Sequence, residues 1–266
     1  MKKPIISIIT ICFENPEELE STLRSVQLHY LRDVLEMIVI DGSRNDDCSD
    51  IVKNYQWVDK YIHELDSGRF SAMNKGIALA TGNYLIFMNS GDQIFERLNM
   101  KKLLNRLVDL QDKIFYGDNY MTFAGKRYLN CVLPEVNRKT FIFGNPPCHQ
   151  SVLFPLKFCQ DHGYDELLNV SADTKFMISA FESMAHEHLG QIISIFALGG
   201  VSNNPKSLLD AMKSWNERRI ARDLSVLIYS PNLLKSIIKY LMVKIVGYEK
   251  YQLSRLSKTK IRLQEL

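Results

Sequence analysis

Ala80-Thr-Gly-Asn-Tyr-Leu-Ile-Phe-Met-Asn-Ser-Gly-Asp92 is the stretch of this 266-residue chain that decides the fold. Its apolar run Tyr84–Met88 is typical of a buried strand, and the polar turn Asn89–Asp92 follows at the carboxyl end of that strand. The segment Ser71–Ala80, which precedes it, has helical spacing and is closed by Gly82. A helix that leads into a buried strand predicts an α/β protein with a parallel sheet.

The first hundred residues repeat this alternation. Further segments are predicted as strands over Ile5–Cys12, Glu36–Ile40 and Tyr61–Leu65 and as a helix over Glu17–Gln27. In open α/β sheets, ligands bind at the carboxyl ends of the strands. We therefore expect Asp41, which follows the second strand, and Asp92 to lie on the same rim of the sheet.

The pattern is weaker after residue 100. It predicts helices over Met100–Leu110 and Thr174–Met184, strands over Lys113–Tyr116 and Arg127–Val132, and a loop over Gly144–Ser151. From Pro205 onward helical patterns dominate. We interpret His186 and His188 as surface residues, because no carboxylate partner at a recognised spacing supports a zinc site.

The composition is that of an ordinary folded protein, with 46% apolar and 24% charged residues. A net charge of +3 does not indicate nucleic-acid binding. The five cysteines are odd in number and show no C-x-x-C spacing, which favours a reducing cytosol and buried thiols over disulfides or a structural zinc site. The start of the chain is too short for a signal h-region and is predicted to be the first strand.

Basic residues gather at the C-terminus, where the segment from Pro231 to Leu266 holds eight of them against Glu249 and Glu265. On a helix, Leu233–Tyr248 presents an apolar face edged by lysines, which suits an anionic membrane surface through residues 233–262. A helix packed on the main domain with solvated lysines is the competing interpretation. No uninterrupted apolar run approaches the roughly 18 residues of a membrane span, so we expect a soluble or peripheral protein.

Five segments together resemble the family 2 glycosyltransferases of the GT-A fold. They are Ser7-Ile-Ile-Thr-Ile-Cys-Phe-Glu-Asn15, Ile38-Val-Ile-Asp-Gly-Ser43, Asp66-Ser-Gly-Arg-Phe-Ser-Ala-Met-Asn-Lys-Gly76, the stretch ending at Asp92, and Cys148-His-Gln-Ser151. The resemblance is greatest to enzymes of bacterial surface polysaccharides, such as colanic acid, capsule and O-antigen. It implies a Rossmann-like, mostly parallel sheet flanked by helices.

The resemblance also implies a division of the chain. Residues 1–205 would form the GT-A catalytic domain, with a donor half of about 1–100 and an acceptor half of about 101–205. Residues 206–266 would form a helical, basic C-terminal extension.

The resemblance assigns donor-binding roles in the first half. Asp41 matches the carboxylate that accepts a hydrogen bond from the uracil ring, and Phe13 matches an aromatic beside the base. Asp66, Arg69, Asn74 and Lys75 match a segment that lines the nucleotide and diphosphate. The alternatives are an Asx-turn at Asp41, a core Phe13, and a helix N-cap at Asp66 or Ser67 with a solvated helix face.

Asp92 matches the second acid of an Asp-x-Asp motif that binds Mn²⁺ or Mg²⁺ together with the donor diphosphate, a task that needs few protein ligands. Asn89 replaces the first acid and offers a neutral oxygen, which weakens the expectation of tight metal binding. A plain β-turn is the alternative for this segment.

The acceptor side is matched by three residues. Asp173 stands at the position of the catalytic base, although Ala172 replaces the usual acid before it, and a helix N-cap is the alternative. His149 and Gln150 lie in the loop that resembles the acceptor-side segment; a structural His149 is equally compatible. Gly199-Gly200-Val201-Ser202 resembles a loop that closes over the donor.

These matches imply an inverting transfer of a sugar from a UDP-hexose or UDP-N-acetylhexosamine to a saccharide acceptor, carried on a polyprenyl diphosphate, at the inner face of the cytoplasmic membrane. A dinucleotide-binding oxidoreductase is disfavoured because no G-x-G-x-x-G follows the first strand. A sugar nucleotidyltransferase is disfavoured because the N-terminus lacks a glycine- and arginine-rich phosphate loop. A non-catalytic scaffold in a polysaccharide assembly complex is the remaining alternative, favoured by Asn89 and Ala172 and opposed by Asp41, Asp92 and Asp173.

Overall fold

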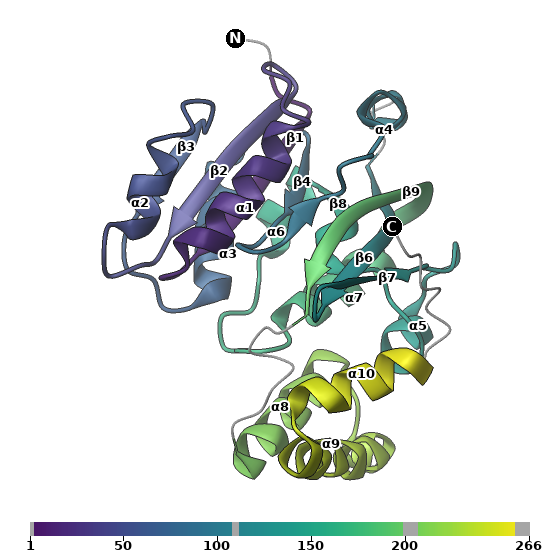
Figure 1. Ribbon diagram of the computed structural model, residues 1–266. Helices are drawn as coiled ribbons and strands as arrows, with labels where there is room; N and C mark the ends of the chain where they lie inside the picture. The colour runs from purple at the N-terminus through teal and green to yellow at the C-terminus, as the bar shows by residue number, and fades with distance from the viewer. Residues whose placement is uncertain (1–2, 108–111, 199–206, 259–266) are drawn as a thin grey trace.

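One continuous sheet runs through the computed structural model, which describes residues 3–107, 112–198 and 207–258 (Figure 1). Within these residues the sheet follows the order β3-β2-β1-β4-β8-β6-β9-β5, and β7 pairs with β6. Helices cover the sheet, and three C-terminal helices form a separate layer at one end. The mixed α/β fold flanked by helices is therefore confirmed.

The N-terminal half has the predicted parallel arrangement. Its strands are β1 (Ile6–Cys12), β2 (Leu35–Asp41), β3 (Lys60–His63) and β4 (Tyr84–Phe87), and its helices are α1 (Pro16–Gln27), α2 (Asp47–Val52) and α3 (Arg69–Leu79). The strands β1, β2 and β4 are buried almost throughout, which explains why their sequences are nearly continuous apolar runs. Register pairs Cys12 with Asp41 and places the ends of β1 and β2 side by side.

The second half is mixed rather than parallel. It contains β5 (Gln93–Ile94), α4 (Met100–Leu107), β6 (Lys113–Phe123), β7 (Lys126–Asn130), α5 (Arg138–Phe143), the 3₁₀ turn η1 (His149–Ser151), β8 (Val152–Pro155), α6 (Leu156–His162), α7 (Ala172–Ser183) and β9 (Ala185–Ala197). Strand β8 runs antiparallel to both β4 and β6, whereas β6 and β9 are parallel. The sheet is therefore mostly parallel only in its first half.

Three predictions need correction here. Strand β6 extends seven residues past the predicted end at Tyr116, and β9 was not predicted at all. His186 and His188 lie on β9 and are packed rather than superficial: both rings contact Tyr116, and His188 Nε2 lies 3.2 Å from Asp118 Oδ1.

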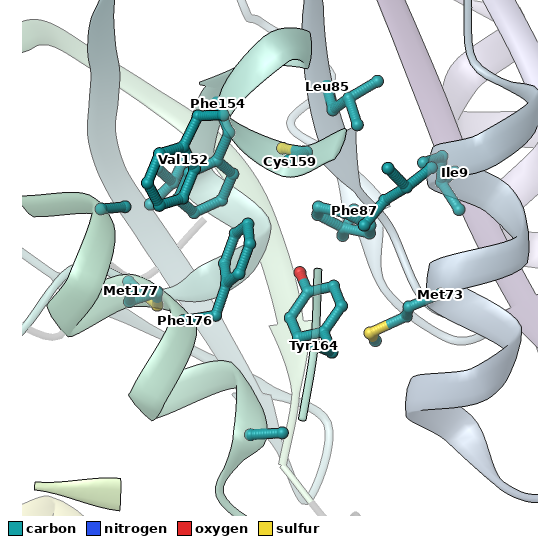
Figure 2. Close-up of a cluster of buried hydrophobic side chains, with 14 of the residues drawn as sticks. Ile9, Met73, Leu85, Phe87, Val152, Phe154, Cys159, Tyr164, Phe176 and Met177 are labelled. Carbon is teal, nitrogen blue, oxygen red and sulfur yellow. The ribbon is translucent and has the colours of Figure 1, made fainter. Parts of the chain in front are cut away.

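Side chains pack on both faces of the sheet. On one face, aromatic residues from β4, β8, α7 and the segment before α7 interlock: Phe87, Phe154, Phe176 and Tyr164 are all at most 5% exposed (Figure 2). On the other face, α1 buries Leu19, Leu23 and Val26 completely against β1 and β2. Burying a side chain of this kind stabilises the fold by about 1.5–3 kcal/mol, so these layers hold the strand ends in place.

The C-terminal layer consists of α8 (Leu208–Ala221), α9 (Val226–Val246) and α10 (Tyr248–Lys258), as the helical pattern predicted. The Ser207 and Ser225 side chains accept hydrogen bonds from backbone N–H groups in the first turns of α8 and α9, which fixes where these helices begin. Trp215 of α8 stacks on Tyr229 of α9 and donates its indole N–H to the Tyr229 carbonyl at 3.2 Å.

Helix α9 is the most exposed apolar element described. By length and composition it could cross a membrane, although serine, proline and lysine residues divide its apolar run. Only 6% of an apolar 18-residue stretch of this helix is buried inside the protein. Exposed apolar residues lie along one stripe at spacings of three, four or seven positions, at Leu227, Leu234, Ile238, Leu241 and Ile245.

Candidate functional site

Asp92 lies in a buried turn at the end of β4 and is only 4% exposed. Gln150 Nε2 donates to its Oδ2 at 2.8 Å, and the backbone N–H of Ala197 donates to its Oδ1 at 3.3 Å. The Thr22 hydroxyl of α1 donates to the Asp92 carbonyl at 2.7 Å and accepts from Gly91 N. Burial nevertheless raises the pKa of Asp92 to about 7, so the site favours a neutral carboxyl unless a cation is bound nearby.

The neighbours of Asp92 offer unused oxygens. Asn89 Oδ1 and Ser90 Oγ are both buried, and neither has a hydrogen-bond partner among the described residues. A buried polar atom without a partner is costly, which makes it a candidate for an absent ligand. With Asp92, they form a set of hard oxygen atoms on one turn, the type of ligand that Mg²⁺ and Mn²⁺ prefer.

Gln150 connects the Asp92 turn to the acceptor-side loop. Cys148 Sγ lies 3.0 Å from Gln150 Oε1 and donates to it, so the Gln150 amide is oriented from both ends. Burial and the charges of Asp92 and Asp173 raise the pKa of the Cys148 thiol. The thiol is therefore close to both carboxylates, and the structure brings these two predicted residues to one region.

Asp173 is the second residue of α7 and is partly exposed. Asp173 Oδ1 accepts a hydrogen bond from the backbone N–H of Thr174 at 2.6 Å, within the first turn of α7. Ser171 is the N-cap residue of this helix, so the alternative interpretation of Asp173 as an N-cap is not supported. Its charge acts on His149, Tyr164 and Arg218. An accessible carboxylate in this place is suited to accept a proton.

His149 belongs to the core rather than to an open surface. It is 7% exposed, stacks on Phe87 with ring centroids 5.1 Å apart, and its Nε2 lies 2.6 Å from the Tyr164 hydroxyl. Figure 2 shows that hydroxyl directed into the aromatic cluster. Burial lowers the pKa of His149 to about 4, so the ring is neutral and shares a hydrogen bond with the Tyr164 hydroxyl. The structural alternative for His149 is the one that these contacts support.

Asp41 is completely buried at the end of β2. Its Oδ1 accepts from Ser43 N at 2.9 Å, the Asx-turn that the sequence offered as the alternative, and its Oδ2 accepts from the Tyr61 hydroxyl at 2.7 Å. The thiols of Cys12 and Cys48 lie within 4.8 Å of this carboxylate. Soft thiols do not suit Mg²⁺ or Mn²⁺, so this cluster is not the metal site implied by the resemblance.

The rim above Asp41 is open. Phe13 is 50% exposed, and the Arg44 guanidinium lies over its ring at 5.5 Å. Phe13 is therefore not an ordinary core residue. The Asp66 carboxylate lies against Gly42, where a Cβ would collide with its Oδ2. A side chain at position 42 would displace the Asp66 carboxylate, so this contact brings the Asp41 turn and the Asp66 segment together.

Three residues of α3 have different environments. Arg69 lines a cleft of about 220 Å³ between the start of α3 and residues 166–170. The Asn74 side chain makes its hydrogen bonds within the fold. Its amide N–H groups donate to the Tyr164 carbonyl and to Glu166, and its Oδ1 accepts from Tyr164 N at 2.8 Å. Lys75 pairs with Glu64 at 2.8 Å. Of the three, Arg69 is the one that lines a cleft.

Some contributors were not identified from the sequence. Thr22 supports the Asp92 turn from α1, Tyr61 holds Asp41, and Tyr164 holds His149. Each is an isolated polar residue with partners between 15 and 70 positions away. No local spacing indicates such pairs. The proposed closing loop 199–202 lies outside the described residues.

Comparison with known proteins agrees with this arrangement. Residues 7–146 match the family described as glycosyl transferase family 2. An uncharacterized glycosyltransferase of Mycobacterium tuberculosis is 30% identical over 188 residues, which cover 66% of this chain and 69% of that protein. A PGL/p-HBAD biosynthesis glycosyltransferase of Mycobacterium bovis is 26% identical over 213 residues, covering 76% and 81%.

Solved structures share the fold. The crystal structure of S. aureus TarS 1-349 in complex with UDP has a TM-score of 0.61 at 13% identity, covering 98% of this chain and 76% of that one. The complex of the same protein with UDP-GlcNAc has a TM-score of 0.57 at 13% identity and covers 92% and 73%.

Proposed function

Because this chain belongs to glycosyltransferase family 2, we propose that it transfers a sugar from a nucleotide diphosphate donor, a UDP-hexose or UDP-N-acetylhexosamine, to a saccharide hydroxyl with inversion. The observation that carries the proposal is the buried Asp92 turn, where a carboxylate and the unpartnered oxygens of Asn89 and Ser90 stand at the end of β4. The complexes of TarS with UDP and UDP-GlcNAc support a uridine donor.

The described residues divide the work. Phe13 and Arg44 offer an exposed aromatic and a cation at the rim, where a base can stack and a phosphate can be neutralised. Both carboxylate oxygens of Asp41 already accept hydrogen bonds, from Ser43 and Tyr61. Its predicted role toward uracil therefore requires that one of these oxygens accept a second hydrogen bond. Arg69 is proposed to contact the donor diphosphate, and its position in the cleft beside residues 166–170 supports this role.

Asp173 is proposed as the base. Its carboxylate has one hydrogen-bonded oxygen, from Thr174, so it can accept the proton of an attacking hydroxyl as the bond to the anomeric carbon forms and the diphosphate leaves on the opposite face. Gln150 and Cys148 orient the Asp92 carboxylate on the other side of the proposed site.

The oxygens of Asp92, Asn89 and Ser90 fit Mn²⁺ or Mg²⁺ by their chemistry. A divalent cation bound there would supply positive charge to the diphosphate leaving group. The raised pKa of Asp92 agrees with a carboxylate kept for a cation, because a nearby positive charge lowers the pKa of a buried acid.

We further propose an acceptor carried on a lipid, polyprenyl diphosphate in the simplest case, at the inner face of the cytoplasmic membrane. The support is the exposed apolar stripe of α9, which Lys235 and Lys244 flank.

The test is hydrolysis and transfer assayed with a panel of UDP- and GDP-sugars, with and without Mn²⁺, for wild type and Asp92→Asn. A matched control is Asp59→Asn, at an acid that lies away from this site and accepts from Met37 N. We expect turnover of one donor class that requires metal, is abolished in Asp92→Asn and persists in the control. Binding without turnover of any donor would favour the scaffold instead.

A further inference from the structure

One face of α1 carries the hydroxyl groups of Ser21, Thr22 and Ser25. Residues three or four positions apart lie on the same face of a helix, so the three hydroxyls are neighbours. They make hydrogen bonds with the segment Asn89–Ile94, which contains the Asp92 turn and β5. The partners are between 67 and 72 positions apart in the sequence. Helix α1 therefore holds this segment through tertiary contacts.

The Thr22 hydroxyl lies against the backbone of the Asp92 turn. It donates to the Asp92 carbonyl at 2.7 Å and accepts from the Gly91 N–H at 3.0 Å, and the Asn89 carbonyl is 3.3 Å away. The Asp92 N–H closes the turn by donating to the same Asn89 carbonyl at 2.9 Å. Thr22 is completely buried, so these hydrogen bonds form in surroundings of low dielectric constant, where they are strong.

The two other hydroxyls of α1 hold the residues that follow the turn. Ser25 Oγ accepts from the Ile94 N–H at 3.0 Å, and Ser21 Oγ accepts from Gln93 Nε2 at 2.6 Å. Ser25 is buried as well, with 7% of its surface exposed. The bonds from α1 thus continue from the turn into β5.

The turn needs such external support. Gly91 lies in it with φ +93°, and a glycine backbone permits many conformations. Asn89 Oδ1 and Ser90 Oγ have no hydrogen-bond partner among the described residues, so the positions of these two oxygens depend on the backbone that carries them. A site for a divalent cation needs its oxygens at fixed separations, most strictly for Mg²⁺.

We infer that Thr22 is a positioning residue for the cation site proposed at Asn89, Ser90 and Asp92: its hydroxyl fixes the backbone of that turn and thereby raises the affinity for Mn²⁺ or Mg²⁺. Thr22 acts through the turn and is not itself a ligand. The inference rests on the proposed function, because it takes the cation site from there.

The experiment measures Mn²⁺ binding to the full chain by calorimetry, without any nucleotide sugar. Thr22→Val keeps the branched shape of the side chain but can neither donate nor accept a hydrogen bond. We expect its Kd for Mn²⁺ to rise by about tenfold. Thr22→Ser retains the hydroxyl and should bind within about twofold of wild type. Wild-type affinity in Thr22→Val would overturn the inference.

Ser7→Ala is the matched control, because it removes a hydroxyl as deeply buried as that of Thr22. Ser7 lies near the start of β1, where it donates to Glu36 and accepts from Gly82 N at 2.8 Å. Ser7→Ala and Thr22→Val should both lower the melting temperature, but only Thr22→Val should lose affinity for Mn²⁺. An equal loss of affinity in both variants would mean that Mn²⁺ binding follows overall stability, and the positioning role would be refuted.

Ser25→Ala takes the place of Thr22→Val if that variant does not fold. It removes the bond to Ile94 N, which lies beyond the turn, so the expected rise in the Kd for Mn²⁺ is smaller, about threefold. An unchanged Kd in this variant would count against the inference.

Hydrolysis of UDP-sugars in the presence of Mn²⁺ tests the proposed function separately. If no donor is hydrolysed but Mn²⁺ binding depends on Thr22 as described, the proposed function fails and the positioning role stands. If wild type hydrolyses a donor with Mn²⁺ while Thr22→Val binds Mn²⁺ normally, the positioning role fails and the proposed function stands.

Discussion

The side-chain amide of Gln150 donates to the Asp92 carboxylate at 2.8 Å across 58 positions of sequence. The bond joins the turn after β4 to the turn before β8, and these strands are antiparallel neighbours in the sheet. Because Cys148 fixes the other end of the same amide at 3.0 Å, the orientation of the carboxylate depends on the acceptor-side loop. The turn after β4 and the loop before β8 are thus coupled through one side chain.

Replacement of Gln150 by Leu should therefore impair the site without unfolding it. The Asp92 carboxylate would lose the bond from Gln150, and we expect donor hydrolysis to fall by about tenfold to a hundredfold, the cost of one hydrogen bond to a charged group. The steady-state rate is the measurement. Gln160→Leu, at an exposed position of α6, is the control and should retain full activity.

Asp92 should lower stability in metal-free buffer at neutral pH. Its folded-state pKa of about 7 lies above the ordinary 3.8, so its favourable contribution is complete below about pH 4 and is lost as the pH rises through 7. Asp92→Asn does not titrate. In EDTA, the free energy of unfolding of Asp92→Asn minus that of wild type should therefore increase by about 4 kcal/mol between pH 4 and pH 7. Urea unfolding measures this, and parallel pH profiles would refute it.

His149 should make the protein sensitive to acid. Its pKa of about 4 in the fold lies below the ordinary 6.5, so the folded state binds fewer protons and stability is lost as the pH falls from about 6.5 to 4. The side chain of His149→Gln can still accept a hydrogen bond from Tyr164. Across that pH range we expect the free energy of unfolding of this variant to fall by about 3 kcal/mol less than that of wild type. Thermal melts at a series of pH values test this, and identical slopes would count against it.

Asn89→Asp should strengthen metal binding. The substitution adds a second carboxylate to the turn of Asp92, and an ionised oxygen binds a divalent cation more tightly than an amide oxygen does. We expect the Kd for Mn²⁺, measured by calorimetry, to fall by about tenfold. Asn54→Asp, at an exposed position after α2, is the matched control. If both variants bind Mn²⁺ as wild type does, Asn89 does not contribute a ligand.

The stripe on α9 should bind vesicles. Leu234, Ile238 and Leu241 are between 49% and 61% exposed, so replacing all three with Ser should leave the melting temperature nearly unchanged. Sedimentation with vesicles that contain phosphatidylglycerol should show wild type bound and the triple variant free. Leu167→Ser, at a side chain 89% exposed far from α9 in sequence, is the control. Equal binding of the triple variant would exclude α9 as the contact.

The first half of the fold was predictable because β1, β2 and β4 are buried on both faces and their sequences therefore form nearly continuous apolar runs. Strand β9 lacks this signal. Glu187 and Gln191 interrupt its apolar residues, Gly190 adopts φ +61°, and its pairing with β6 shifts register between Tyr116 and Asn119. No single period describes such a strand, so it was missed.

The site was predictable only in part for a related reason. The positions of Asp92 and Asp173 follow from strand and helix ends, which local sequence determines. The environment of Asn74 does not: its partners Tyr164 and Glu166 lie 90 and 92 positions away. The same limit applies to Asp41, whose carboxylate accepts a hydrogen bond from Tyr61, 20 positions away.

The pairing of β5 with β9 determines when the Asp92 turn can be completed during synthesis on the ribosome. Gln93 and Ile94, directly after Asp92, pair with Ser194 and Ile195, and Ala197 supplies an N–H to the carboxylate. A nascent chain that has reached β4 thus holds the acid but lacks the strand that positions it. The proposed site is therefore incomplete until about a hundred more residues have been translated.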